Sequence, residues 1–279
     1  MKLGRLLAHV LLIAFILLMF LPLYLGLVAA SHDGQAFLQT PAPYWPGGLL
    51  WHNIKTVMTT SLSVTGGEPL WVMLLNSFIM ASIIAVGKII LALTSAFALV
   101  YFEFPLKKTA FVLIFATMML PIEVRIIPTF QLISDFSWLN SYWGLTMPLL
   151  ASATATFLFK QFFQTLPSQL VDAARLDGAG PCRFFLHMLL PLSKTQIAAM
   201  FVIMFVYGWN QYLWPLIITT ETDMATIVMG IRYLAGVADQ VPQWHYIMTV
   251  AFIALLPPCG VVLLLQRWFE KGLYQEWQQ

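Results

Sequence analysis

Charged side chains are scarce in this sequence of 279 residues: only 9% are Asp, Glu, Lys or Arg, whereas 60% are hydrophobic. A soluble domain averages about 25% charged and about 45–50% apolar residues, so this composition excludes an ordinary soluble domain. It also excludes a disordered chain, because disorder requires low hydrophobicity and high charge. The formal net charge of +2 is too small for the basic surface of a nucleic-acid-binding protein, so no nucleic-acid partner is expected.

Cysteine and the motifs of catalysis are equally sparse. The two cysteines, Cys182 and Cys259, are far apart and form no metal-binding pair. The five histidines show no HxxxH or HExxH spacing. The chain has neither the GxxxxGK[ST] loop that cradles nucleotide phosphates nor the GxSxG nucleophile motif. We therefore expect no catalytic residues, no metal site and no cofactor.

Long apolar runs are what the sequence has instead, and they predict an all-α membrane protein. A helix needs about 20 apolar residues to cross the ~30 Å hydrocarbon core of a bilayer. The first run could be a cleaved signal peptide, but it is longer than the 7–15 residues typical of one, so we interpret it as a span. We predict six transmembrane helices in a single domain over residues 1–279. The predicted spans are about 6–29, 70–100, 109–133, 142–162, 197–220 and 246–268.

The distribution of basic residues predicts the orientation, because cytoplasmic loops are enriched in Lys and Arg. With the N-terminus inside, ten of the fourteen basic residues are cytoplasmic and only Lys55 and Arg232 are outside. Both termini are therefore expected in the cytoplasm. Residues 31–69, rich in Pro and Gly, are expected to form an outer loop with little regular structure. The ten basic residues predicted on the cytoplasmic side are Lys2, Arg5, Lys107, Lys108, Lys160, Arg175, Arg183, Lys194, Arg267 and Lys271.

The longest inner loop, residues 165–196, contains signals for two short helices. Ser168 can cap the start of the first helix, and Gly178 is a typical residue just past its end. The second is predicted to begin at Pro181 and to end before Pro191. Short exposed helices with small residues suit docking into a groove on a partner, and the alternative is a solvated loop.

This loop resembles the EAA loop of the membrane subunits of ABC importers. The family pattern is Glu-Ala-Ala, three residues, Gly, nine residues, Ile, one residue, Leu-Pro. Here Asp172 stands for Glu and Met188 for Ile, with the spacing kept. The resemblance implies that the loop binds in a cleft of an ATPase subunit and transmits its closure to the membrane helices. The residues to which it assigns this role are Asp172, Ala173, Ala174, Asp177, Gly178 and Pro191.

Three further segments, residues 119–128, 151–159 and 207–215, are similar to carbohydrate-importer permeases of the maltose type. Within that family they most resemble the second permease subunits of sn-glycerol-3-phosphate importers. The resemblance implies a type I ABC importer permease fold in the bacterial inner membrane, with sn-glycerol 3-phosphate, and also glycerophosphodiesters, as candidate substrates. An uncharged sugar or oligosaccharide is the alternative substrate. The implied partners are a second, homologous permease subunit, two ATPase subunits that bind the ATP, a periplasmic or lipid-anchored substrate-binding protein and membrane lipids.

Three charged residues fall in the interior of predicted spans, away from the span ends: Lys88, Glu123 and Arg125. A charge at the centre of a bilayer costs roughly 2.5–3.5 kcal/mol and indicates function by default. Arg binds phosphate through paired hydrogen bonds, so Arg125, and with less weight Lys88, are predicted to line the path of a phosphate group. The alternative is that Glu123 and Arg125 neutralise each other or lie near the lipid headgroups. A stand-alone secondary transporter would need more intramembrane carboxylates than Glu123 and an internal repeat.

Trp209, Asn210 and Gln211 supply an aromatic surface and two amides within the fifth predicted span. Such groups could contact a polyol in the substrate path. The alternative is that they form hydrogen bonds between helices and part of the interfacial aromatic belt. The last outer loop, residues 221–245, corresponds by position to the loop that reaches into the binding protein in maltose-type importers.

Overall fold

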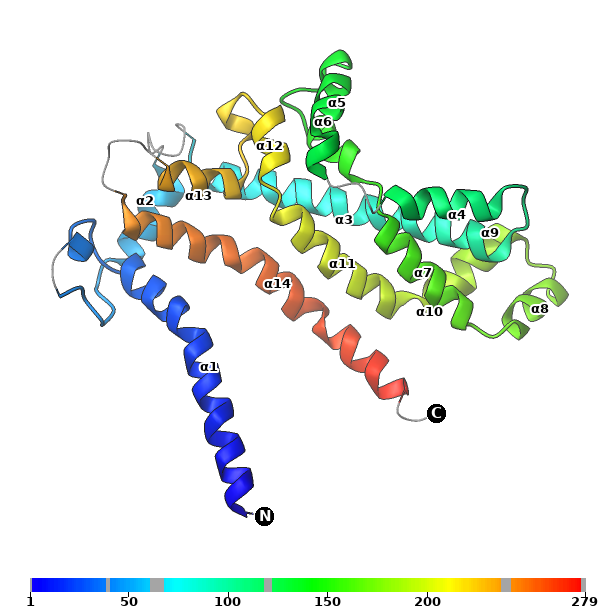
Figure 1. Ribbon diagram of the computed structural model, residues 1–279, viewed down its shortest axis with the longest axis horizontal. Coiled ribbons are helices and arrows are strands. Elements are labelled where there is room, and N and C mark those ends of the chain that lie inside the picture. The colour runs from blue at the N-terminus through cyan, green and yellow to red at the C-terminus, as the bar shows by residue number, and fades with distance from the viewer. Residues whose placement is uncertain (1, 39–40, 61–67, 118–121, 237–241, 277–279) are drawn as a thin grey trace. The chain divides into compact units, whose positions relative to one another are not determined.

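The structure is a computed structural model that describes residues 2–38, 41–60, 68–117, 122–236 and 242–276. Side chains are described for residues 4–37, 41–60, 68–117, 124–236 and 242–268. Regular structure in these ranges is helical throughout, which confirms the all-α prediction (Figure 1). The α-helices are α1 (Lys2–Ala30), α2 (Leu50–Thr59), α3 (Leu70–Tyr101), α4 (Lys107–Ala116), α5 (Ile122–Asp135), α6 (Tyr142–Thr146), α7 (Ala153–Thr165), α8 (Gln169–Leu176), α9 (Pro181–Phe184), α10 (Leu190–Leu192), α11 (Lys194–Trp209), α12 (Leu213–Ile218), α13 (Ile227–Ala235) and α14 (Trp244–Glu276).

Three helices in the described ranges are long and apolar enough to cross a membrane: Gly4–Ala30 in α1, all of α3, and Trp244–Trp268 in α14. They correspond to the first, second and sixth predicted spans. A fourth candidate arises if Pro181–Leu192 and Lys194–Trp209 are counted as one span, but these two parts meet at a bend of 75°. Six continuous transmembrane helices are therefore not confirmed, and the location of the termini stays a prediction.

The predicted span 109–133 corresponds to two separate helices, α4 and α5. α4 has 10 residues, and at a rise of 1.5 Å per residue it is about 15 Å long, half the thickness of the hydrocarbon core. α5 has 14 residues and contains Pro128, which has no backbone N–H to donate within the helix. Residues 118–121, which include Pro121, lie outside the described part of the chain.

The predicted span 142–162 is divided into α6 and α7. Between them lie a 3₁₀ turn at Met147–Leu149, which contains Pro148, and a non-helical segment. Each helix has its own capping serine. Ser141 and Ser152 each accept a hydrogen bond from the backbone amide three residues later, at 3.2 and 3.3 Å. Such caps satisfy amides that a helix start leaves without an intrahelical partner, so two helices form where the apolar run predicted one.

The predicted span 197–220 is divided into α11 and α12. α11 begins at Lys194 and ends at Trp209, and Asn210 has left the helical conformation at φ −84° and ψ 7°. α12 then contacts α5 and α6. Non-helical backbone is tolerated at membrane depth where protein surrounds it, and interrupted helices of this kind are common in transporters.

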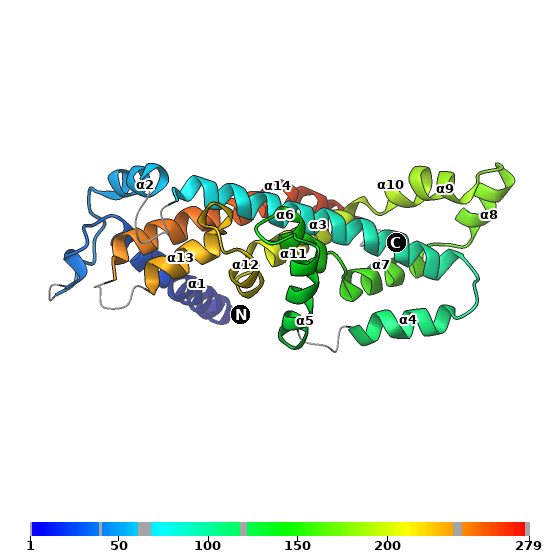
Figure 2. The same cartoon turned by 90° about the horizontal axis from the view of Figure 1, so that it is seen from above.

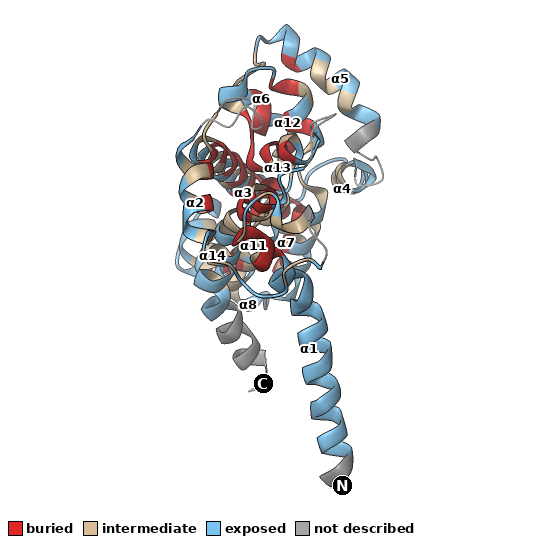
Figure 3. Cartoon of the chain, turned by 90° about the vertical axis from the view of Figure 1, so that its left-hand side faces the viewer, coloured by how far each residue is buried: buried red, intermediate tan, exposed pale blue. Residues whose placement is uncertain are grey.

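The chain divides into two compact units, residues 1–75 with 225–256 and residues 76–224 with 257–279. α3 and α14 each contribute to both units. In the first unit most of α1 is exposed, as its pale blue colour in Figure 3 shows, and its exposed surface is almost entirely apolar. Such a surface is stable in lipid or against another membrane helix, and not in water.

The outer stretch 31–69, also in the first unit, has more regular structure than predicted, because α2 occupies Leu50–Thr59. Asn53 in α2 is buried, and its Nδ2 donates hydrogen bonds to the carbonyls of Ala30 and His32 at 2.9 and 2.8 Å. These bonds attach α2 to the end of α1. The prediction of little regular structure is therefore wrong for this helix.

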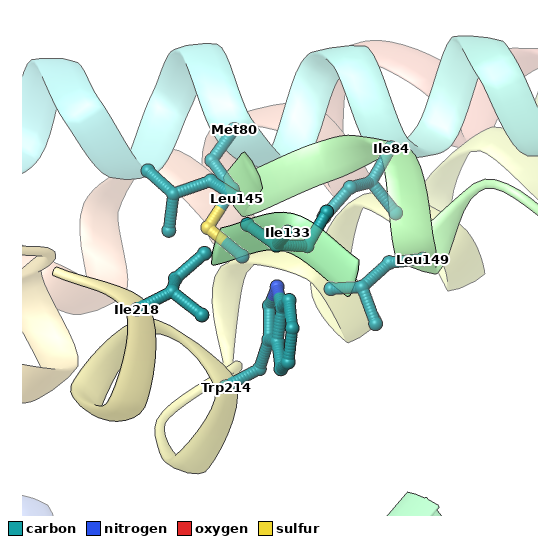
Figure 4. Close-up of a cluster of buried hydrophobic side chains, with 7 residues drawn as sticks. All are labelled: Met80, Ile84, Ile133, Leu145, Leu149, Trp214 and Ile218. Atoms are coloured by element: carbon teal, nitrogen blue, oxygen red, sulfur yellow. The ribbon is translucent and has the colours of Figure 1, made fainter. Parts of the chain in front are cut away.

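The core of the second unit lies where α3, α5, α6, α12 and the 3₁₀ turn meet. Met80 and Ile84 of α3 pack there against buried side chains from α5, α6 and α12 (Figure 4). Trp214 of α12 fills the centre, and its indole N–H donates to the carbonyl of Gly144 at 3.1 Å. This bond satisfies the polar edge of a buried tryptophan. The members of the core are Met80, Ile84, Ile133, Leu145, Leu149, Trp214 and Ile218.

Candidate functional site

The loop that resembles the EAA loop contains α8, whose end is built around Gly178. Gly178 has a left-handed conformation at φ 69°, and it follows the last helical turn directly. The amide of Gly178 donates to the carbonyl of Arg175 at 3.0 Å, and the amide of Ala179 donates to the carbonyl of Ala174 at 2.9 Å. These two bonds define a Schellman motif, so the prediction that Gly178 ends the helix is confirmed.

The start of α8 differs from the prediction. Ser168 precedes the helix, but its side chain makes no capping hydrogen bond. Its backbone already has helical angles, φ −61° and ψ −26°, whereas a capping side chain reaches the first turn from an extended backbone. Ser168 contributes through its carbonyl instead, which accepts from the amides of Val171 and Asp172 at 2.9 and 3.2 Å.

Ala174 is the one candidate in α8 that packs into the second unit, with 3% of its surface exposed. It lines a pocket of about 170 Å³ between α8, α9 and the end of α3. Figures 1 and 2 both place α8 and α9 on the side where α3 and α7 end. The small side chain lets α8 lie close to this aromatic surface. The pocket is lined by Phe97, Tyr101, Phe102, Val171, Ala174, Arg175, Ala179, Pro181 and Phe184.

Aromatic residues connect this pocket to α3 and α7. The ring of Tyr101 at the end of α3 meets that of Phe184 edge to face, with centroids 5.3 Å apart. Its hydroxyl donates to the carbonyl of Phe163 in α7 at 3.4 Å. Sequence reasoning did not identify Tyr101 or Phe184 as part of this site, because no local pattern indicates that two aromatics so far apart in sequence meet.

The other candidates of this loop are exposed. The exposed side chains are those of Asp172, Ala173 and Asp177. Asp172 and Arg175 form an ion pair at 3.9 Å, which is worth little on a solvated surface. The exposed residues of α8 therefore combine this ion pair with the small side chain of Ala173 and the apolar side chain of Leu176, which is 89% exposed.

Pro191 lies inside a continuous helical path, and not after its end. Pro181 is the first residue of α9, as predicted. The helix then widens into a π turn at Phe185–Leu189 and continues through α10 to Leu192. An α-helical turn would press the proline ring against the preceding turn, and the wider turn relieves that clash. The predicted end before Pro191 is therefore wrong.

Of the in-membrane charges, Lys88 lies in the buried part of α3, with its ammonium 3.9 Å from the centre of the Tyr207 ring. Arg125 lies in α5, where its side chain is exposed in this chain and lines a small pocket with Thr129 and Leu149. The side chain of Glu123 lies outside the described residues. Tyr207 belongs to α11 and was not identified from the sequence as a partner of Lys88.

The candidates at the end of α11 have different surroundings. Trp209 is buried and stacks on Phe205, with ring centroids 5.8 Å apart. Asn210 is exposed. Gln211 turns back to α11, since its Nε2 donates to the carbonyl of Tyr207 at 3.1 Å. In this chain the three residues form no common surface for a ligand.

Comparisons with known proteins add the family. A family described as "Binding-protein-dependent transport system inner membrane component" matches residues 88–274. The chain is 52% identical over 265 residues to the sn-glycerol-3-phosphate transport system permease protein UgpE of Yersinia enterocolitica, covering 95% of this chain and 94% of that one. The protein of the same name from Pectobacterium atrosepticum is also 52% identical, over 266 residues.

A solved structure with a similar fold is a chain of a bacterial ABC transporter involved in the import of the acidic polysaccharide alginate. The TM-score is 0.82 at 18% sequence identity, and the match covers 96% of this chain and 97% of that one. This likeness shows the ABC transporter permease fold. The chain is a multi-pass membrane protein, and it belongs to the family of binding-protein-dependent transport system inner membrane components.

Proposed function

We propose that this chain is a permease subunit of an ABC importer that carries sn-glycerol 3-phosphate across the bacterial inner membrane. The observation that carries this proposal is the 52% identity to permeases named for that substrate, over 95% of the chain. The matches leave out only about 5% of this chain, and the family model alone spans the loop of α8, Lys88 and Arg125 within residues 88–274.

The proposed topology has six crossings with both termini in the cytoplasm. α1, α3 and α14 each cross once, and the pairs α4 with α5, α6 with α7, and α11 with α12 supply the other three. Ten of fourteen basic residues then lie on the cytoplasmic side, in agreement with the positive-inside rule. Interrupted crossings of this kind suit a permease, since the breaks can line a path for solute.

In this proposal the exposed face of α8 binds an ATPase subunit, and the opposite face transmits the motion. Asp172, Ala173 and Asp177 are exposed for docking, whereas Ala174 is packed on the aromatic pocket beside Tyr101. A displacement of α8 would therefore displace the ends of α3 and α7 with it. This chain would bind no nucleotide, and ATP would be hydrolysed by its partners.

The proposed complex contains this chain, a second, homologous permease, two ATPase subunits and a substrate-binding protein. The test is to express these chains together in cells that lack other uptake routes and to measure entry of labelled sn-glycerol 3-phosphate. We expect entry only when the full set is present, and competition by unlabelled substrate but not by neutral sugars. Entry with this chain alone would indicate a secondary transporter, and entry of a neutral sugar instead would contradict the proposed substrate.

A further inference from the structure

Lys88 is a buried cation without a described carboxylate partner. It has 6% of its surface exposed and lies in the interior of α3. Among the residues whose side chains the structure describes, the ion pairs are Glu103 with Lys107 and Asp172 with Arg175, and neither involves Lys88. Burial of a charge is expensive unless it is paired, and a charge retained inside a membrane protein is a functional residue by default.

Tyr207 provides the contact that Lys88 does make. The ammonium lies over the face of the Tyr207 ring at 3.9 Å from its centre, where the negative face of an aromatic ring attracts a cation. The neighbouring residue, Gly208, explains how the ring reaches this place. A Cβ added to Gly208 would lie 2.9 Å from the Cα of Ala81, so only glycine permits α11 to approach α3 so closely.

Arg125 brings a second positive charge to the same region. A Cβ added to Gly87, the residue before Lys88, would lie 2.6 Å from Leu150, which directly follows Leu149. Arg125 also lines a small pocket with Thr129, Leu149 and Trp214. Leu149 and Trp214 belong to the core of Figure 4, and Tyr207 packs against that core. Lys88 therefore adjoins this cluster through Tyr207, and Arg125 adjoins it through the pocket that it shares with Leu149 and Trp214.

We propose that Lys88 and Arg125 together form a subsite for the phosphate group of a phosphomonoester, and that Tyr207 holds the Lys88 ammonium while no anion is bound. The inference rests on the proposed function and adds to it the residues that select the substrate. A phosphomonoester carries a charge of about −1.5 to −2 and three acceptor oxygens. Arg125 supplies paired donors, and Lys88 supplies a compact charge.

This arrangement discriminates by charge. Two neighbouring cations repel each other when the site is empty, and a bound dianion removes that repulsion. A neutral sugar of similar size would leave both charges unpaired. Unpaired buried charges make binding of the wrong ligand unfavourable, and specific sites reject ligands in this way. In the empty site the ammonium makes the cation–π contact with Tyr207. When a phosphate binds, the ammonium exchanges this weak contact for a stronger ion pair.

The test uses the whole complex in proteoliposomes and measures the KM and maximal rate of sn-glycerol 3-phosphate uptake. Lys88→Met removes the charge and keeps the apolar stem, and Arg125→Gln removes the second charge at an exposed position. We expect each to raise KM about tenfold, the loss typical of one charge-assisted hydrogen bond. Lys88→Arg and Tyr207→Phe keep the charge and the ring, and should stay within about threefold of the unmodified complex.

Lys160→Met is the matched control, because Lys160 also lies over an aromatic ring, that of Phe111 at 4.6 Å, away from the proposed subsite. Its KM should be unchanged. Unchanged KM in both Lys88→Met and Arg125→Gln would overturn the inference while leaving the proposed function intact. If the unmodified complex does not take up sn-glycerol 3-phosphate, the proposed function fails instead.

Two alternative partners for these cations, the Glu123 carboxylate and a lipid phosphate, predict different results. If Glu123 neutralises Lys88 or Arg125, Glu123→Gln will raise KM as much as Lys88→Met does, and that result would contradict a subsite for substrate. If a lipid phosphate occupies the site, the variants will change the maximal rate and not KM, which would also overturn the inference. Should Lys88→Met fail to assemble, Arg125→Gln decides the question, since the Arg125 side chain is exposed in this chain.

Discussion

The amide of Ala179 donates a hydrogen bond to the carbonyl of Ala174 at 2.9 Å, across the left-handed turn at Gly178. Both alanines also line the aromatic pocket beside Tyr101. The same few residues therefore end α8 and place its inner face on the pocket. In the proposed mechanism, a force on α8 passes through this contact to α3 and α7, so the rigidity of the turn determines how well the force is transmitted.

We predict that Gly178→Ala weakens coupling between ATP hydrolysis and transport. A side chain in the left-handed region costs roughly 1–2 kcal/mol, so the end of α8 would rearrange. The measurement is the amount of substrate transported per ATP hydrolysed, which should fall. Gly180→Ala is the matched control, because Gly180 has no positive φ and no atom within 4 Å of an added Cβ. Equal coupling in the two variants would refute the role of the turn.

The two neighbouring alanines of α8 should respond differently to enlargement. Ala174→Leu overpacks a buried position, and we expect it to lower the stability of the chain by about 1–3 kcal/mol. Ala173→Leu enlarges an exposed position, and it should instead reduce the amount of ATPase subunit that co-purifies. Thermal unfolding in detergent and quantified co-purification separate the two effects. If Ala173→Leu destabilises the chain as much as Ala174→Leu, the assignment of inner and outer faces is wrong.

Gly208 should be intolerant of even a methyl group. The added Cβ would meet the backbone of Ala81 at 2.9 Å, and a backbone cannot rotate away as a side chain can. Small residues permit such close helix contacts in membranes, so Gly208→Ala should destabilise the chain by about 1–3 kcal/mol. Gly260→Ala, in the open part of α14 with nothing near an added Cβ, serves as the control and should not lower the unfolding temperature. Similar unfolding temperatures for both variants would disprove the contact.

The long helices were predictable from the sequence because hydropathy alone specifies them. The runs that became α1, α3 and α14 are predominantly apolar over more than 20 residues, although α3 contains Lys88. The breaks inside the other predicted spans depend on local backbone preferences that an average over a long window does not register. Ser152, for example, caps α7 with one hydrogen bond at 3.3 Å, although it lies in an otherwise apolar stretch.

The parts of the candidate site that could be predicted from the sequence are those where a residue type strongly favours one backbone conformation. Gly178 was identified because a left-handed residue at a helix end is usually glycine. Ser168 was assigned a capping role from its type alone, but the role depends on a backbone angle that the sequence does not specify. The contact of Lys88 with Tyr207 joins helices far apart along the chain, and it exists because Gly208 lets those helices touch. No local pattern contains that information.

The most direct test of the central claim is ATP-driven accumulation of labelled sn-glycerol 3-phosphate in proteoliposomes that contain this chain with its proposed partners. The account predicts accumulation that requires ATP, the ATPase subunits and the binding protein, and that neutral sugars do not inhibit. Accumulation by vesicles that contain this chain alone, or ATP-driven accumulation of a neutral sugar in place of the phosphate ester, would contradict it.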